Sequence, residues 1–308
     1  MNKGYNLKTA KKVKKSQKKS STKLNVIREL KGKTILVTGG AGSVGSVLSK
    51  KLLEYPIKSL RVLDIDENAL FKLNRTLKDT RLRLLLGNIL DIDRIEMAGN
   101  KVDLIIHLAA IKNIEISEFN PIEAVDVNIN GTINMIKMAM KTSPKKFLNI
   151  STDKAADSTT MYGTTKLMAE RLVTWAGIHI HPTTKFASAR FGNVIESRGN
   201  VFEVWQEELK KGKPLSITHE KMNRYFFHVD EAVDFILKCI PLINEGEIFV
   251  PKMKAYDIKN LATKISKKQK IIGTRPGEKL SEILITKDEL KRSKEKADMW
   301  IIKPRIQS

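Results

Sequence analysis

The chain has 308 residues, of which 41% are hydrophobic, and carries a formal net charge of +22. It is long enough to bury a large core, and its hydrophobic content is ordinary for a globular protein. No segment has the roughly eighteen apolar residues of a membrane helix, and the N-terminus lacks the apolar core of a secretory signal. Cys239 is the single cysteine, which excludes a disulfide within the chain and favours a reducing compartment, the cytoplasm.

Positive charge is concentrated at the N-terminus. Residues 1–30 contain nine lysines and Arg28 against Glu29 alone, so they carry +9 of the net charge. Because apolar side chains are scarce there, we predict that residues 1–31 form a disordered, solubilising tail. Clustered lysines would also permit weak contact with polyanions or an anionic membrane surface. Aromatic residues do not alternate regularly with the lysines, so no specific nucleic-acid partner is expected.

A strand, a glycine turn and a helix are predicted next. The apolar run Lys33–Val37 leads into Thr38–Gly45, and helical spacing of apolar residues follows. Gly39 permits a tight turn, Gly42 lets the backbone approach a pyrophosphate, and Gly45 lets helix and strand pack closely. The helix N-terminus would offer N–H groups and a positive dipole to the anion. The residues expected to contact a dinucleotide here are Gly39, Gly42, Ser43, Val44 and Gly45.

Asp64 is the expected ribose ligand. It ends a second strand, Leu60–Leu63, roughly twenty residues beyond the glycine turn, where a carboxylate accepts hydrogen bonds from the adenosine ribose. A carboxylate there repels a 2′-phosphate. NAD is therefore favoured over NADP, although Lys72 or Arg75 would still be able to reach such a phosphate.

Two further strands are expected to border the cofactor. Asn88 follows the strand Leu84–Leu86 and is predicted to face the adenine. The strand Leu104–Ala110 ends in small residues, so that Ala109 leaves room for the cofactor. His107 lies within this buried strand, and we interpret it as structural rather than catalytic.

The segment Ser151–Lys166 places several proton-transferring side chains between a strand and a helix. Phe147–Ile150 has the pattern of a buried strand, and helical spacing begins at Gly163. Tyr162 and Lys166 are four residues apart and share a helix face. An ammonium beside a phenol is expected to lower the tyrosine pKa, which suits a base that takes a proton from a sugar hydroxyl. Tyrosine and lysine at this spacing are common on protein surfaces. The nucleotide-binding motif that precedes this pair supports a catalytic role for it.

Together these residues resemble the extended short-chain dehydrogenase/reductase superfamily. Within it, the chain resembles the UDP-N-acetylglucosamine 4,6-dehydratases of surface-glycan synthesis over about residues 30–308. The shared motifs are HLAAIKNI (107–114), STDKAA (151–156), YGTTK (162–166), RFGNVIESRGNV (190–201), GEIFVPKM (246–253) and GTRPGEKLSEIL (273–284). The resemblance implies a doubly wound parallel α/β sheet of the Rossmann type in residues 32–190 and a smaller nucleotide-sugar lobe in residues 191–308. Residues 228–250 are expected to return partly to the first lobe.

The resemblance also implies a reaction and roles. Enzymes of this family that invert C5 keep a tyrosine at the position of Tyr162, and the absence of a membrane segment also favours that subgroup. Tyr162, held as phenolate by Lys166 and the oxidised cofactor ring, would take the proton when the C4 hydroxyl is oxidised. Lys154 would remove the C5 proton, with Asp153 as the acid or its partner. The net reaction is a dehydration by a lyase that regenerates its bound cofactor.

The substrate side is also assigned by resemblance. Arg275 would contact the UDP diphosphate, and arginine's planar fork suits such a group. Arg224 would be a second phosphate contact. The other positions expected around the nucleotide sugar are Lys112, Thr152, Asn193, Arg198 and Thr218. No metal is expected. The chain departs from the usual family residues at Asp157, Ser158, Glu196 and Asn223, and Glu196 would repel a diphosphate unless it points to solvent.

Two other classes of function stay open. A UDP-sugar epimerase on the same scaffold would need the glycine turn and Tyr162 but not the Asp153 and Lys154 pair. A basic binding protein would have kept the fold without chemistry. Family members assemble as dimers or hexamers, so a homo-oligomer is expected.

Overall fold

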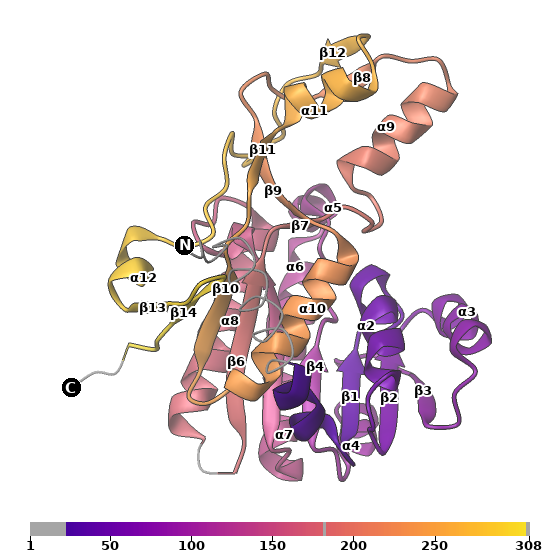
Figure 1. Ribbon diagram of the computed structural model, residues 1–308, viewed down its shortest axis with the longest axis vertical. Coiled ribbons are helices and arrows are strands. Elements are labelled where there is room, and N and C mark those ends of the chain that lie inside the picture. Colours follow the sequence, from indigo (N-terminus) through magenta and orange to yellow (C-terminus); the bar gives the residue numbers. More distant parts are fainter. Residues whose placement is uncertain (1–22, 181–182, 306–308) are drawn as a thin grey trace, which may run out of the picture.

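The computed structural model describes residues 23–180 and 183–305, which form two lobes (Figure 1). In the described chain, the large lobe is built on a nine-stranded sheet of order β13-β14-β10-β6-β5-β4-β1-β2-β3. Its strands are β1 (Thr34–Thr38), β2 (Ser59–Asp64), β3 (Leu82–Leu86), β4 (Leu104–His107), β5 (Lys146–Thr152), β6 (Lys185–Phe191), β10 (Glu247–Pro251), β13 (Ser293–Glu295) and β14 (Met299–Ile302).

Seven neighbouring strands of this sheet, from β10 to β3, run parallel. The strand order reverses between β1 and β4, which is where open α/β sheets bind ligands at the carboxyl ends of their strands. The two remaining strands, β14 and β13, are antiparallel additions beside β10. The predicted doubly wound α/β fold is confirmed.

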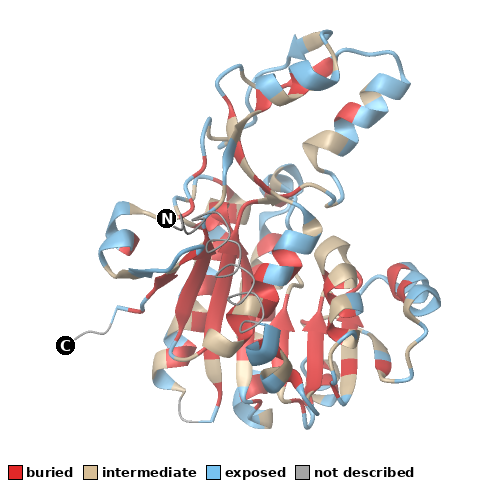
Figure 2. Ribbon diagram, viewed as in Figure 1, coloured by how far each residue is buried: buried red, intermediate tan, exposed pale blue. Residues whose placement is uncertain are grey.

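Helices cover both faces of the sheet, and its central strands are buried along most of their length (Figure 2). On β1, Ile35 and Val37 face one apolar layer and Leu36 faces the other, as strand alternation requires. The first layer contains α2 (Ser43–Leu53), α3 (Glu67–Leu77) and α10 (Val229–Cys239). The second contains α4 (Ile92–Gly99), α7 (Gly131–Thr142) and α8 (Met161–His179).

Shorter helical segments connect these layers. They are α5 (Ile114–Phe119), α6 (Pro121–Val125), the π-helix η1 (Asp126–Asn130), and the 3₁₀ turns η2 (Asp153–Ala155) and η3 (Ile240–Leu242). Near the C-terminus, α12 (Lys287–Lys291) lies beside β13 and β14 (Figure 1).

The small lobe stands above the carboxyl ends of the strands (Figure 1). It contains β7 (Asn193–Val194), α9 (Val201–Lys210), β8 (Leu215–Ile217), β9 (Asn223–Phe227), β11 (Ala255–Asp257), α11 (Ile258–Ile265) and β12 (Gln269–Ile271). Its own core is centred on Trp205, Ile217 and Phe226. The chain returns to the large lobe through α10 and β10, within residues 228–250. It returns again through β13 and β14, which the sequence had assigned to the small lobe.

The predicted N-terminal tail needs correction at its C-terminal end. Residues 23–30 form a helix, and Val26 and Leu30, four residues apart on one face, are buried in the core. Glu29 pairs with Lys146 of β5 at 2.8 Å. Two well-placed apolar residues therefore dock a segment that looked solvated from its charge. Residues 1–22 of the predicted tail lie outside the described residues.

Arg190 of β6 joins three parts of the large lobe. Its guanidinium is fully buried and donates to both carboxylate oxygens of Glu170 on α8, at 2.9 and 2.6 Å. It also donates to both oxygens of Glu289 on α12, at 2.9 and 2.8 Å, and to the carbonyl of Leu284 at 3.0 Å. One cation thus satisfies two carboxylates inside the protein.

We predict that Arg190→Met destabilises the protein by about 3 to 5 kcal/mol, because two buried carboxylates lose their partner. Urea unfolding followed by circular dichroism would measure this. The matched control is Arg305→Met, which breaks an exposed pair with Asp288 beside the same helix and should cost less than about 1 kcal/mol. Equal losses in the two variants would contradict a special role for Arg190.

Candidate functional site

A cavity of about 820 Å³ opens where β1 and β4 end, and both lobes line it. Every residue assigned to the site from the sequence lies on its wall except Asp153. The lining residues among those predicted are Gly39, Gly42, Ser43, Val44, Gly45, Asp64, Asn88, Ala109, Lys112, Thr152, Lys154, Tyr162, Lys166, Asn193, Arg198, Thr218, Arg224 and Arg275. The folding of the chain therefore brings residues from about position 39 to 275 to one cleft.

The glycine turn has the geometry of a dinucleotide cradle. Gly39 has a φ of +66°, and a Cβ there would lie 2.7 Å from the backbone nitrogen of Ala109. A Cβ on Gly45 would lie 2.3 Å from the carbonyl oxygen of Gly39. No side chain caps α2, whose N-cap is Gly42, so the first N–H groups of the helix remain for an anion at the cavity. The residues present fit a bound pyrophosphate.

Asp64 is held against this turn. One carboxylate oxygen accepts from Ala41 N at 2.9 Å, and the other accepts from Asp66 N at 3.1 Å. Neither Lys72 nor Arg75 lines the cavity, and the Arg75 guanidinium lies over the ring of Phe71, 5.7 Å from its centroid. Neither of the two cations considered for a 2′-phosphate is therefore part of the cavity wall.

Tyr162 and Lys166 come from the first turns of α8. Thr160 caps this helix by accepting from Gly163 N at 3.1 Å. A residue that the sequence analysis missed, Asn128 of the π-helix η1, donates to Thr165 Oγ1 at 3.0 Å and to Ile111 O at 2.9 Å. A buried asparagine therefore ties α8 to the loop after β4. The sequence offered no signal for it beyond a polar residue in an apolar stretch.

The pKa of Tyr162 differs from the prediction. Burial raises it, because a desolvated phenolate is disfavoured, although a hydrogen bond with the Thr152 side chain acts in the opposite direction. Burial also lowers the pKa of Lys166 to about 8. The expected lowering of the tyrosine pKa is therefore not found for the protein alone, because desolvation and the negative charge of Asp153 both raise it.

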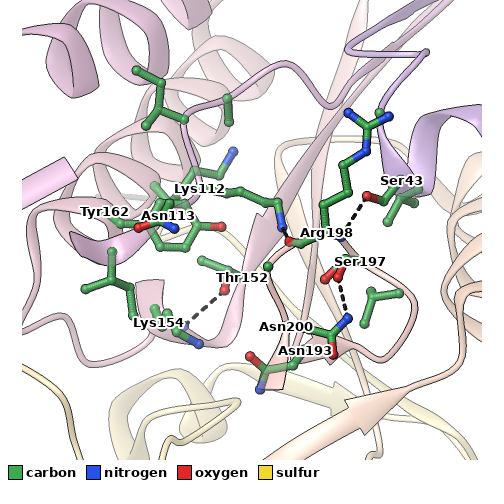
Figure 3. A pocket seen from close by; sticks show the side chains of 18 of the residues that line it. Ser43, Lys112, Asn113, Thr152, Lys154, Tyr162, Asn193, Ser197, Arg198 and Asn200 are labelled. Atoms are coloured by element: carbon green, nitrogen blue, oxygen red, sulfur yellow. Dashed lines mark hydrogen bonds between the residues drawn. The ribbon is translucent and has the colours of Figure 1, made fainter. Parts of the chain in front are cut away.

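Lys154 reaches the cavity from the 3₁₀ turn η2 with Asp153 behind it. Lys154 Nζ donates to Asp153 Oδ1 at 3.0 Å, and Thr152 Oγ1 donates to the same oxygen at 3.0 Å. Asp153 Oδ2 is buried and has no hydrogen-bond partner among the described residues. Figure 3 shows Lys154, Thr152 and Tyr162 close together on the cavity wall.

Two arginines of the substrate side share a carboxylate. Arg224, on β9, pairs with Glu278 at 3.1 Å, and the backbone nitrogen of Arg275 donates to the other Glu278 oxygen at 3.2 Å. The Arg224 side chain is almost buried, whereas Arg275 is exposed at the rim. The cavity wall therefore carries one nearly buried guanidinium and one exposed guanidinium, groups suited to binding phosphate.

Contacts between the lobes cross the cavity at Arg198. Lys112 Nζ donates to Arg198 O at 2.7 Å, and Arg198 N donates to Ser43 Oγ of α2 at 3.1 Å (Figure 3). Arg198 therefore lies above the glycine turn, closer to the expected cofactor than its assignment to the sugar implied. Asn193 donates to Tyr225 O at 3.0 Å and stays on the small-lobe side.

The unusual residues have local partners. Glu196 does not line the cavity: its oxygens accept from His228 Nδ1 at 2.7 Å and from Val229 N at 2.8 Å, at the start of α10. Asp157 forms an ion pair with Lys279 at 2.7 Å. The expected repulsion between Glu196 and a diphosphate is therefore removed by the direction of its side chain.

The other two departures are also accommodated. Ser158 Oγ shares a hydrogen bond with Thr164 Oγ1 at 2.7 Å, and Asn223 N donates to Leu280 O at 2.8 Å. Across residues 23–180 and 183–305, no cluster of side chains suited to a metal ion is found.

Comparisons with known proteins match most of the chain. Residues 35–304 match a family model described as polysaccharide biosynthesis protein. The chain is 43% identical to an uncharacterized membrane protein of Methanocaldococcus jannaschii, over 89% of this chain and 86% of that protein. It is 36% identical to an inverting UDP-N-acetylglucosamine 4,6-dehydratase of Campylobacter jejuni, over 89% and 84%. The solved structure of Pen from Bacillus thuringiensis has a TM-score of 0.85 at 35% identity, over 89% and 88%.

These likenesses agree with the motif series found in the sequence. A UDP-glucose 4-epimerase of Rickettsia bellii is also 32% identical, over 88% of this chain and 82% of that enzyme. Within the described residues, no helix has the length and apolar character needed to span a bilayer.

The Glu196 contact predicts a pH-dependent stability. Glu196 raises the pKa of His228 above its ordinary value, so the stabilisation is complete below the unfolded pKa of about 6.5 and is lost as pH rises through the folded pKa. Glu196→Gln should therefore lower the free energy of unfolding more at about pH 5.5 than at about pH 9. Because the pair is exposed, the difference should stay below about 1 kcal/mol. Urea titrations at both pH values would measure it, and a loss that does not vary with pH would contradict it.

Proposed function

This chain belongs to the polysaccharide biosynthesis protein family, and we propose that it removes water from UDP-N-acetylglucosamine with inversion at C5. The observation that supports this most strongly is the Lys154 and Asp153 pair, at 3.0 Å, beside Tyr162 in one cavity. The side chains of Asp153 and Lys154 are 0% and 11% exposed, so this is not the solvated ion pair that such neighbours usually form.

NAD is the proposed cofactor, held by the glycine turn and Asp64. Bound NAD would accept a hydride from C4 and return it to C6, so no external reductant is consumed. Its pyrophosphate would meet the uncapped N-terminus of α2, and its adenosine ribose would meet Asp64.

The chain's own residues would move the protons. Tyr162 would take the proton of the C4 hydroxyl as a phenolate. Because burial alone disfavours the phenolate, the positive charges of Lys166 and of the oxidised nicotinamide would be needed to stabilise it. The C4 ketone then acidifies the C5 proton. Lys154 removes that proton and passes it to the C6 hydroxyl, which leaves as water as the C5–C6 double bond forms. Of the two roles left open for Asp153, the partner of Lys154 fits better, because its carboxylate lies behind Lys154 and off the cavity wall. Return of a proton to the opposite face of C5 gives inversion.

The epimerase is the second candidate function, favoured by relatives that carry that name. It would use the same glycine turn and Tyr162 but would give Lys154 no proton to remove from C5. A binding protein without chemistry would have no need for the buried pair at all.

The setting of the reaction is also proposed. A cytoplasmic location agrees with the buried thiol of Cys239. Exposed apolar side chains on α5 and α6, Phe119 and Ile122, support self-association as a dimer or hexamer. Contact with polyanions or a membrane surface would depend on the lysines of residues 1–22.

Lys154→Ala is predicted to reduce water loss from UDP-N-acetylglucosamine by at least about 100-fold, because a positioned base is removed. Mass spectrometry of the nucleotide sugar gives the rate, and deuterium from solvent should no longer enter C5. The control is Lys294→Ala, an exposed lysine on β13, which should turn over normally. An unchanged mass with altered stereochemistry in the wild type would favour the epimerase, and no change at all would favour the binding protein.

Asp64 is predicted to select NAD over NADP by at least about tenfold, the ratio that roughly 1.4 kcal/mol supplies. Calorimetry on protein stripped of cofactor would measure both affinities. Asp64→Asn keeps the size of the side chain but removes its charge, so the ratio should fall. Equal affinities in the wild type would refute the assignment.

A further inference from the structure

Glu282 lies next to the proposed base but takes no part in the proposed proton transfers. It belongs to the segment 280–284, whose backbone is held at both ends. Asn223 N donates to Leu280 O at 2.8 Å, and Asn223 forms a parallel bridge with Ser281. At the other end, Arg190 donates to Leu284 O at 3.0 Å. The side chain of Glu282 therefore projects from a fixed backbone.

The carboxylate of Glu282 faces the ammonium of Lys154. Glu282 Oε1 lies 3.9 Å from Lys154 Nζ, and the two side chains are 7% and 11% exposed. Asp153 Oδ1 approaches the same nitrogen at 3.0 Å. One ammonium thus lies between two carboxylates that come from separate parts of the chain, η2 and the segment 280–284.

Other charges surround Glu282. Burial raises its pKa, as does Asp153, whereas Lys154, Arg224 and Lys279 act to lower it. Because a buried carboxyl group with a raised pKa gains a proton easily, its charge depends on the cations around it. Among these cations, Lys154 lowers the pKa of Glu282 the most.

A purely structural role does not account for this placement. The loop that carries Glu282 is already attached to the catalytic segment by the Lys279 and Asp157 ion pair at 2.7 Å. Thr159 Oγ1 also donates to Gly277 O at 2.7 Å. Buried carboxylates that hold a fold are usually hydrogen-bonded, yet among the described residues the Glu282 carboxylate makes no hydrogen bond.

We propose that Glu282 is a positioning residue, which orients Lys154 toward the substrate and stabilises its ammonium form after it has taken a proton. This rests on the proposed function, in which Lys154 removes the C5 proton. With Asp153 alone the ammonium would have one counter-charge, and with Glu282 it has two. Loss of the Glu282 charge removes one of the two counter-charges that favour the ammonium over the neutral amine.

The test compares Glu282→Gln, Glu282→Asp and the control Glu295→Gln, an exposed glutamate paired with Lys252 on the far edge of the sheet. For each variant, kcat for water loss from UDP-N-acetylglucosamine is measured against pH. In Glu282→Gln the acid limb of the profile should move to lower pH and the maximum should fall about tenfold. Glu282→Asp should recover part of the loss, and Glu295→Gln should match the wild type.

A second measurement does not depend on activity. The rate at which acetic anhydride modifies Lys154, followed by peptide mass spectrometry, should rise at lower pH in Glu282→Gln than in the wild type. An unshifted acid limb together with an unshifted labelling profile would overturn the proposal, as would a change confined to KM. If the wild type removes no water, the proposed function fails, and the labelling profile still decides whether Glu282 controls Lys154.

Discussion

The geometry of the site depends on the buried guanidinium of Arg190. A cation with no exposed surface must be fully paired, and Arg190 achieves this only by bringing Glu170, Glu289 and the carbonyl of Leu284 to one point. Glu170 lies on α8, one turn after Lys166, and Leu284 lies two residues after Glu282. The requirement to neutralise one charge therefore sets the relative positions of the two segments that border Lys154.

Much of the large lobe could be predicted because its signals are local. The strand before Gly39, the glycine turn and the acidic residue Asp64 follow from short-range patterns, and the fold then brings the carboxyl ends of parallel strands together. The shared face of Tyr162 and Lys166 follows from helical spacing alone. The residues on the substrate side were predicted from the resemblance to a family, because residue spacing alone does not identify them.

What the sequence could not predict depends on contacts between distant segments. Glu282 meets Lys154 across more than a hundred residues. It lies in the shared motif 273–284, but neither spacing nor periodicity links it to Lys154. The charge of residues 23–30 led to the prediction of a solvated tail. Instead these residues form a helix, because Val26 and Leu30 pack against a surface that exists only in the folded core. The pKa of Tyr162 was misjudged for the same reason, since the degree of burial is a property of the assembled cavity.

The loop 273–284 connects the two ends of the substrate site. Arg275 and Glu278 lie at the proposed diphosphate contacts, and Glu282, on the same short loop, lies at the proposed base. A diphosphate that draws Arg224 and Arg275 together would act on the loop that also carries Glu282. Binding energy from the nucleotide, which takes no part in the chemistry, would then help to hold Lys154 in place at C5. This explains why a dehydratase would recognise a whole nucleotide sugar although only three carbons of the hexose react.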